Sequence, residues 1–136
     1  MSIKINTVLL IDDDLTINYY HNRLLQKIDI SKSILISKNG KEGLASLIEI
    51  NNNVNGEEIV IIFLDLNMPI MNGWEFLENL SKVKNNINLN FNIYILSSSI
   101  NPEDEERAKK NELVTGFLSK PLGKENIEQI KLKYLQ

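Results

Sequence analysis

The sequence predicts an α/β protein with a doubly wound, five-stranded parallel sheet and five helices. Short apolar runs alternate five times along the chain with longer segments whose apolar residues recur at helical spacing. One run, residues 59–64, contains six apolar residues without a polar break. Such a run is typical of a strand that is buried on both faces of a parallel sheet. Right-handed crossovers between parallel strands place helices on both faces.

Length and composition indicate a single soluble domain and argue against several other classes of protein. The 136 residues are expected to form a single domain. A formal net charge of -3 without a basic stripe argues against direct binding to nucleic acid, and the absence of cysteine excludes disulfides and thiol catalysis. The chain shows no signal-peptide core and no apolar run near the roughly 18 residues that a membrane span needs. We therefore expect a cytoplasmic protein without membrane association.

The first strand and helix are predicted at residues 7–11 and 15–28. Asp14 precedes the helix and is a suitable N-cap, because its carboxylate accepts hydrogen bonds from the free amides of the first turn. His21 is expected to be exposed and receives no role. The apolar positions expected to face the core are Ile17, Tyr20, Leu24 and Ile28.

The middle of the chain continues the alternation. We predict a strand at residues 33–37, a helix at 39–51, a polar loop at 51–58, the central strand at 59–64 and a helix at 72–84. The inward positions expected in the first of these helices are Leu44, Leu47, Ile48 and Ile50. The apolar positions of the second are Trp74, Phe76, Leu77, Leu80 and Val83.

The last part of the chain adds two more strands, at residues 91–96 and 116–119. Asn101 and Pro102 mark the start of a helix between them, with asparagine as the cap and proline at the first helical position. A final helix is expected from residue 122 to the C-terminus. Its core positions are Ile127, Ile130 and Tyr134.

Polar side chains are found where four of these strands end. Asp12 and Asp13 follow the first strand, Asp65 the third, Ser97 the fourth and Lys120 the fifth. The carboxyl ends of parallel strands share one edge of the sheet, where open α/β folds bind ligands. Three carboxylates at one place favour a hard cation, Mg²⁺ before Ca²⁺ or Zn²⁺. Together with a hydroxyl and an ammonium, they predict a phosphoryl site with Asp65 as the nucleophile.

The sequence resembles the receiver domain of two-component response regulators, over nearly its whole length. In that family the fold is flavodoxin-like, which agrees with the pattern above. Each matching motif alone is weak, but four in the same order are specific. The motifs are Val-Leu-Leu-Ile-Asp-Asp-Asp at 8–14, Leu-Asp-Leu-Asn-Met-Pro at 64–69 with Met-Asn-Gly at 71–73, Ile-Leu-Ser-Ser at 95–98, and Gly-Phe-Leu-Ser-Lys-Pro at 116–121.

The resemblance implies a role for each residue of the acidic site. Asp65 would accept the phosphoryl group and also ligate Mg²⁺. Asp13 would bind Mg²⁺ directly, Asp12 through water, and Asn67 through its main-chain carbonyl.

The resemblance also implies a switch. Ser97 and Lys120 would contact the phosphate, Ser97 and Phe117 would act as the switch pair, and Lys120 would precede Pro121 through a cis peptide bond. The affected surface would be the fourth helix, the fifth strand and the fifth helix. Residues 1–136 would form a stand-alone receiver without an output domain.

Partners follow from the same resemblance. The phosphodonor would be a sensor histidine kinase or a histidine phosphotransfer protein, and a further protein would be the downstream target. The chain would not be an enzyme with an external substrate, because it would catalyse only its own phosphorylation and dephosphorylation.

Two alternatives are open. Residues 12–16 match the Asp-x-Asp-x-Thr pattern of haloacid-dehalogenase-like phosphatases, in which Asp12 would be the nucleophile. That family needs further acidic metal ligands after its lysine, and no aspartate follows Asp104 here. The second alternative is a degenerate receiver that binds partners and never carries phosphate.

Overall fold

Five parallel strands form the centre of the part of the chain that the structure describes. The computed structural model describes residues 5–54, 57–99 and 101–134. The strands are β1 (Ile5–Ile11), β2 (Ser33–Ser37), β3 (Ile59–Asp65), β4 (Asn90–Ser97) and β5 (Val114–Ser119). They pair side by side in the order β2-β1-β3-β4-β5, every pair parallel. This order confirms the predicted doubly wound sheet of the flavodoxin-like kind.

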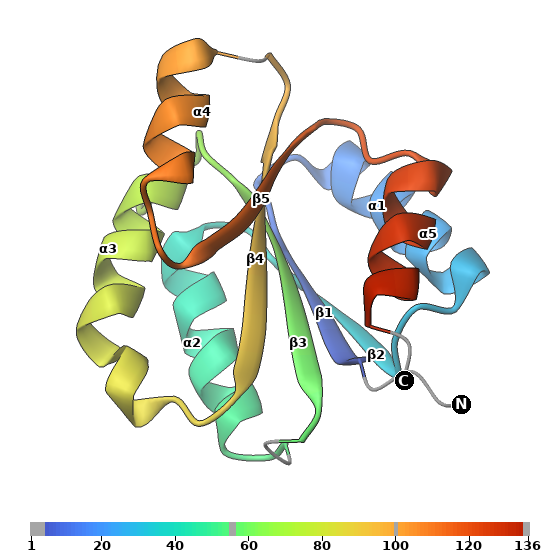
Figure 1. Ribbon diagram of the computed structural model, residues 1–136, viewed down its shortest axis with the longest axis horizontal. Coiled ribbons are helices and arrows are strands. Elements are labelled where there is room, and N and C mark those ends of the chain that lie inside the picture. The colour runs from blue at the N-terminus through green and yellow to red at the C-terminus, as the bar shows by residue number, and fades with distance from the viewer. Residues whose placement is uncertain (1–4, 55–56, 100, 135–136) are drawn as a thin grey trace.

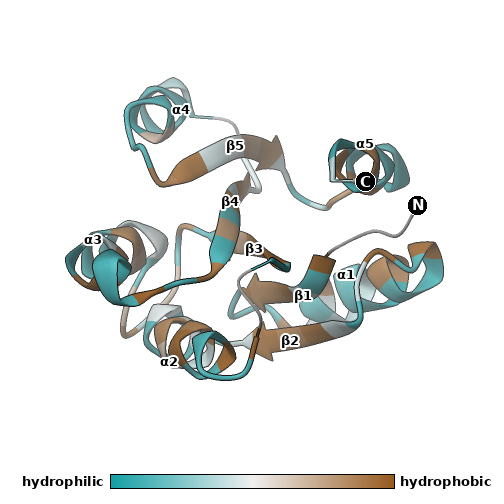
Figure 2. Ribbon diagram, turned by 60° about the horizontal axis from the view of Figure 1, so that its bottom comes forward, coloured by the Kyte–Doolittle hydropathy of each residue, from teal (hydrophilic) through white to brown (hydrophobic). Residues whose placement is uncertain are grey.

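Helices cover both faces of the sheet (Figure 1). They are α1 (Leu15–Ile28), α2 (Gly40–Asn51), α3 (Gly73–Val83), α4 (Pro102–Lys109) and α5 (Lys124–Lys133), with a short 3-10 turn η1 (Lys84–Asn86) after α3. Helices α2, α3 and α4 lie on one side, while α1 and α5 lie on the other (Figures 1 and 2). The alternation expected from the sequence is therefore present along the described chain.

The central strand is buried throughout. All seven residues of β3 are buried, because β1 and β4 flank this strand and helices cover both of its faces. Its alternate side chains enter two separate cores, with Ile62 on the α2–α3 side and Phe63 on the α1–α5 side. The strand includes Asp65, one residue beyond the predicted end, so that carboxylate is fixed by the ladder with β4.

Side-chain caps begin four of the helices. Asp14 caps α1 as predicted, accepting from the amides of Thr16 and Ile17. Asn101 caps α4 with Pro102 at its first position, again as predicted. The remaining two are Asn39 at α2 and Asn72 at α3. Since a cap satisfies amides that have no partner inside the helix, these residues fix where each helix begins after its strand.

Three predictions about helix faces are wrong. Tyr20 of α1 is exposed, and the buried face of that helix consists of Asn18, His21 and Leu25. His21 was expected on the surface but is only 1% exposed. Ile48 of α2 is also exposed, while Leu47 and Ile50 are buried as expected. In α1 the buried stripe is rotated by one residue from the predicted one, whereas in α2 only Ile48 falls outside the buried stripe. Helical spacing alone does not resolve a shift of one residue.

In α2 and α3 apolar residues gather on the face toward the sheet, whereas the buried face of α1 includes the polar residues Asn18 and His21 (Figure 2). None of the described helices has both the length and the apolar character that crossing a lipid bilayer demands.

Candidate functional site

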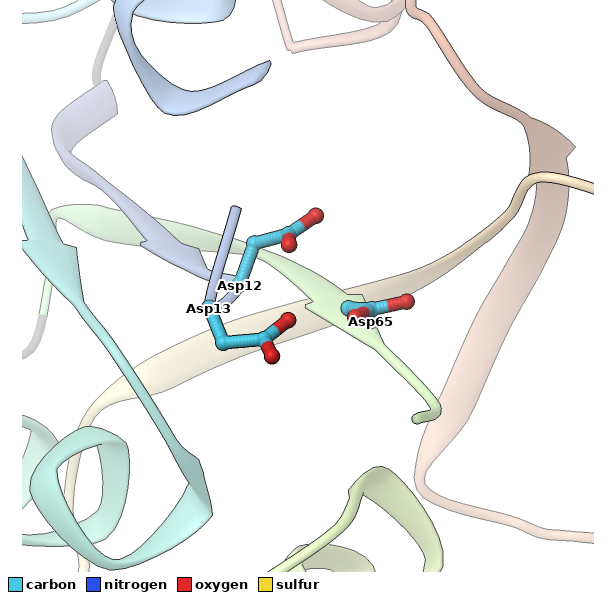
Figure 3. Close-up of side chains that lie close together, drawn as sticks. All are labelled: Asp12, Asp13 and Asp65. Atoms are coloured by element: carbon cyan, nitrogen blue, oxygen red, sulfur yellow. The ribbon is translucent and has the colours of Figure 1, made fainter. Parts of the chain in front are cut away.

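Three carboxylates meet at the carboxyl edge of the sheet. Asp12 and Asp13 follow directly on β1, and Asp65 is the last residue of β3. Because β1 and β3 are neighbours in the sheet, their ends bring these side chains together. One oxygen from each of the three residues lies within 4.8 Å of the others. Figure 3 shows the three carboxylates directed into the same space.

Lys120 lies against two of these carboxylates. It follows β5 directly, and its ammonium is 2.9 Å from Asp12 Oδ2 and 3.3 Å from Asp65 Oδ1. Its main-chain N–H donates to the carbonyl of Ser97 at 2.8 Å, which holds this residue beside the end of β4. The peptide bond between Lys120 and Pro121 is cis. The lysine predicted for the site is thus brought to it across more than 50 residues of sequence.

Burial and the neighbouring charges shift the pKa values of two groups at the site. Burial, and next the charge of Asp12, raise the pKa of Asp65 above its ordinary range, although Lys120 opposes this shift. Burial works against the charged form of Lys120, but the hydrogen bond and charge of Asp12, together with Asp65, outweigh it and raise its pKa. The surroundings therefore favour the charged form of Lys120 and disfavour the ionised form of Asp65.

Asp12 is held by four contacts, one of which runs from its own main-chain N–H to the carbonyl of Ser37 at 3.0 Å. Its Oδ1 accepts the main-chain N–H of Asp14 at 3.0 Å, and its Oδ2 accepts from Lys120. Its main-chain carbonyl accepts the side-chain amide of Asn18 at 2.8 Å. Since both of its oxygens already accept hydrogen bonds, the carboxylate of Asp12 is held in one orientation. Asp13 is exposed and has more freedom to meet a ligand.

The donor set fits a hard divalent cation. The cluster offers three carboxylates, and one ammonium offsets only part of their charge. Oxygen ligands without sulfur or imidazole suit Mg²⁺. Asn67 lies two residues after Asp65 and is exposed, in the same loop at the edge of the sheet. These four residues are the ones that the sequence selected as ligands.

Ser97 has its hydroxyl turned to the backbone. The residue ends β4 and is buried, and its Oγ donates to the main-chain carbonyl of Ser99 at 2.6 Å. It is therefore placed at the same edge as Asp65, in the neighbouring strand, with its hydrogen engaged in the β4–α4 loop. To donate to a group on Asp65, the hydroxyl has to give up this bond.

Phe117 is half-buried in β5, opposite Ile95 of β4, and packs on the α2–α3 side of the sheet. It lies three residues before Lys120 along the same strand and loop. The structure thus brings all the residues that the sequence selected to one edge and its adjoining strand.

His21 and Asn18 are residues of this region that the sequence analysis missed. His21 Nε2 accepts the main-chain N–H of Leu122 at 2.9 Å, so its proton resides on Nδ1. Burial lowers the pKa of His21 to about 4, although Asp12 works in the opposite direction. Asn18, His21 and Leu25 follow one another at intervals of three and four residues, as the buried residues of a helix do. This spacing was the sequence signal that could have identified Asn18 and His21. They connect α1 to the end of β1 and to the chain after Lys120.

The chain is similar in sequence and in structure to known receiver domains. The family model described as "Response regulator receiver domain" matches residues 8–131. No curated protein matches. A two-component response regulator from Cytophaga hutchinsonii is 29% identical, with a TM-score of 0.76 over 96% of this chain and 98% of that one. The chemotaxis protein CheY4 of Vibrio cholerae is 25% identical, with a TM-score of 0.70 over 96% and 99%.

A third similar structure is a complex. It contains the Saccharomyces cerevisiae histidine phosphotransfer protein Ypd1 and the receiver domain of its downstream response regulator Ssk1. The match is 20% identical, with a TM-score of 0.75, and covers 98% of this chain and 91% of that one. At this identity the likeness shows the fold.

Proposed function

This chain belongs to the response regulator receiver domain family, and from that premise we propose that it is a phospho-accepting switch whose nucleophile is Asp65. Receiver domains are signalling switches rather than enzymes that turn over an external substrate. The observation that carries the proposal is the contact of Lys120 with both Asp12 and Asp65 at the sheet edge. This contact supports the proposal, because the ammonium would lie beside the oxygens of a phosphoryl group on Asp65 and offset their charge.

The chemistry is a transfer from nitrogen to oxygen. A carboxylate oxygen of Asp65 attacks the phosphorus of a phosphohistidine, and the bond between phosphorus and the imidazole nitrogen breaks. The leaving nitrogen keeps the electron pair and takes up a proton. Lys120 stays beside the transferred group and offsets its charge. Because burial and Asp12 raise the pKa of Asp65, its carboxylate is also more basic than an exposed aspartate.

Receiver domains bind Mg²⁺ at an acidic pocket. We propose that Asp13, Asp65 and the main-chain carbonyl of Asn67 would bind the ion directly, and that Asp12 would bind it through water. When bound, Mg²⁺ supplies positive charge that lowers the repulsion between an anionic nucleophile and an anionic phosphoryl group.

The output begins at Ser97. We propose that its hydroxyl leaves the carbonyl of Ser99 and donates to the phosphoryl group on Asp65. This change alters the β4–α4 loop, and Phe117 then moves toward the space beside Ser97. The surface that responds is the one formed by α4, β5 and α5, which would change its affinity for a protein target.

The donor would be a histidine kinase or a histidine phosphotransfer protein, as the complex of Ypd1 with a receiver domain suggests by analogy. A cytoplasmic location is part of the same proposal. A phosphatase that uses Asp12 fits less well, because Asp14 and Lys120 already donate to the two oxygens of that carboxylate.

The test is intact-mass spectrometry after incubation with Mg²⁺ and acetyl phosphate. The natural chain should gain one phosphate, and the gain should disappear in Asp65→Asn and when the metal is chelated. Asp29→Asn is the matched control, since Asp29 is an exposed cap at the far end of α1 with φ 57, a conformation that asparagine tolerates. It should be labelled normally. An adduct that persists in Asp65→Asn would contradict the assignment, and a lack of any adduct would favour the degenerate receiver.

A further inference from the structure

Helix α1 holds the main chain near both members of the ion pair between Asp12 and Lys120. The side-chain amide of Asn18 donates to the main-chain carbonyl of Asp12 at 2.8 Å. One turn further along the helix, Nε2 of His21 accepts the main-chain N–H of Leu122 at 2.9 Å. Both side chains lie on the buried face of α1. One helix is therefore bonded to the two chain segments that carry the opposite charges.

Two main-chain N–H groups, one on each side of Pro121, fix the path of the chain around Lys120. The N–H of Lys120 donates to the carbonyl of Ser97 at 2.8 Å. That carbonyl lies at the end of β4, next to the loop that rearranges in the proposed output step. Since proline has no N–H, Leu122 is the first residue after Lys120 that can donate from its main chain. Its bond to His21 joins the segment to α1, which the output step leaves in place.

The imidazole of His21 is suited to act as a permanent acceptor. Burial lowers the pKa of His21 to about 4, although the charge of Asp12 opposes this shift, so the ring is neutral at neutral pH. A neutral imidazole accepts through one nitrogen, which here is Nε2. Leu122 is also buried in the core between α1 and α5. Apolar packing is not directional, however, so the hydrogen bond supplies the orientation that packing alone does not.

We propose that His21 is a positioning residue for Lys120, a proposal that rests on the function given above. Its bond to Leu122 fixes the main chain from which the lysine side chain extends. From there the ammonium reaches Asp12 at 2.9 Å and Asp65 at 3.3 Å. The rate of phosphoryl transfer depends on where this ammonium lies, because it offsets the charge on the phosphoryl oxygens. His21 adds no chemical step: the bond from phosphorus to its leaving group breaks and the bond to Asp65 forms, as described above.

Variants of α1 separate this hydrogen bond from general stability. His21→Leu removes the acceptor and keeps a side chain that packs in the core. His21→Gln restores an acceptor, because the amide oxygen of glutamine lies the same number of bonds from Cα as Nε2 of histidine. Leu25→Ala is the matched control, since Leu25 is a fully buried residue of the same helix face and belongs to the apolar core. All measurements are made well below the lowest melting temperature of the set. His21→Met, with a flexible side chain and only a weak acceptor, replaces His21→Leu if that variant does not fold.

The first readout is the NMR signal of the Lys120 ammonium, recorded without metal or phosphodonor and assigned by its absence in Lys120→Arg. An ammonium held in a buried ion pair exchanges its protons with water slowly enough to be observed, whereas a solvated ammonium does not. The natural chain, His21→Gln and Leu25→Ala should show the signal, and His21→Leu should lose it. A natural chain without the signal, or a signal that persists in His21→Leu, would overturn the proposal.

The second readout is the rate constant for labelling by acetyl phosphate with saturating Mg²⁺, followed by intact mass. His21→Leu should be slower than the natural chain by about tenfold, while His21→Gln and Leu25→Ala stay within about twofold of it. Equal slowing in Leu25→Ala, or no recovery in His21→Gln, would show that His21 acts only on stability and would overturn the proposal. If acetyl phosphate fails to label the natural chain, the proposed function itself fails, while the ammonium signal still decides whether His21 positions Lys120.

Discussion

The region that holds the acidic site and the region proposed to carry the signal are packed very differently. In β3, which ends in Asp65, all seven residues are buried, and the neighbouring α3 buries four of its eleven. In β5 no residue is fully buried, and the eight residues of α4 bury only Ala108. Figure 2 shows α4 as mostly polar, at the margin of the fold. Side chains around the site are therefore buried more completely than those of the α4–β5 region, although β5 pairs along its length with β4.

This difference in burial suggests that the two regions have different roles, one in phosphoryl chemistry and the other in signalling. Phosphoryl chemistry needs groups held in a fixed geometry, and a buried parallel strand provides that. A signal needs an element with more than one accessible position, and such elements come from the least stable part of a fold. The side chain of Arg107 in α4 stacks 4.1 Å from the ring of Trp74 in α3, which is a contact between the two regions. Four predictions test this contrast, from the largest expected effect to the smallest.

The same substitution should have unequal effects in the two regions. Leu77→Ala in α3 removes a fully buried side chain and should lower the free energy of unfolding by about 3 kcal/mol. Leu113→Ala, just before β5, removes a partly buried leucine of the same core and should lower it by about 1 kcal/mol. Urea unfolding of both variants gives the comparison. Equal losses would mean that the α4–β5 region is as firmly packed as the centre.

The buried hydrogen bond between His21 of α1 and the N–H of Leu122 should make the stability of the fold depend on pH. Burial lowers the pKa of His21 to about 4 in the folded protein, against about 6.5 unfolded. Between these values the unfolded chain binds the extra proton, so stability falls as the pH drops. We expect a loss of about 2 kcal/mol between pH 7.5 and pH 5 that is absent in His21→Gln. Equal pH slopes of the natural chain and the variant would contradict this account.

Removing the charge of Asp65 should stabilise the metal-free protein. Its raised pKa means that the ionised carboxylate is less favourable in the folded state than in the unfolded one. Asp65→Asn should therefore raise the free energy of unfolding at pH 7 by a modest amount, smaller than the effect expected at His21. The gain should shrink as the pH falls through the folded pKa toward the ordinary pKa of aspartate, and Mg²⁺ should favour the natural chain. A variant that is less stable than the natural chain at pH 7 without metal would argue against crowded charge at the site.

The stack between α3 and α4 should contribute least. Arg107→Gln removes the cation above the ring of Trp74 and should cost about 0.5–1 kcal/mol. Trp74 is the only tryptophan of the chain, so its fluorescence reports this contact directly. A changed emission in Arg107→Gln, with a smaller change in Arg107→Lys, is the expected result. Identical emission in all three proteins would show that the stack does not persist in solution.

Much of the fold and of the site could be predicted because the relevant signals are local. The run of apolar residues in β3 identifies a buried strand, and Asp65 ends it abruptly. The caps at Asp14 and Asn101 lie immediately before their helices. Parallel strands then bring Asp12 and Lys120 to one edge without any knowledge of side-chain contacts.

What the sequence did not reveal depends on partners far away in the chain. His21 is buried because its acceptor nitrogen meets the N–H of Leu122, 101 residues later. Tyr20 competes with it for the buried face, and apolar spacing favours the tyrosine over the histidine. The bond from Ser97 to the carbonyl of Ser99 and the strained φ of Ile70 are conformational properties, which residue type does not specify.

Amide hydrogen exchange across the chain tests most directly whether a phosphoryl group on Asp65 acts through the loosely packed region. The natural chain and Asp65→Asn would each be measured with Mg²⁺, with and without acetyl phosphate. In the natural chain we predict altered exchange in α4, β5 and the loop after Ser97, with β1 and β3 unchanged, and no change in Asp65→Asn. Exchange that stays the same in α4 and β5 while the natural chain carries one phosphate would contradict the account.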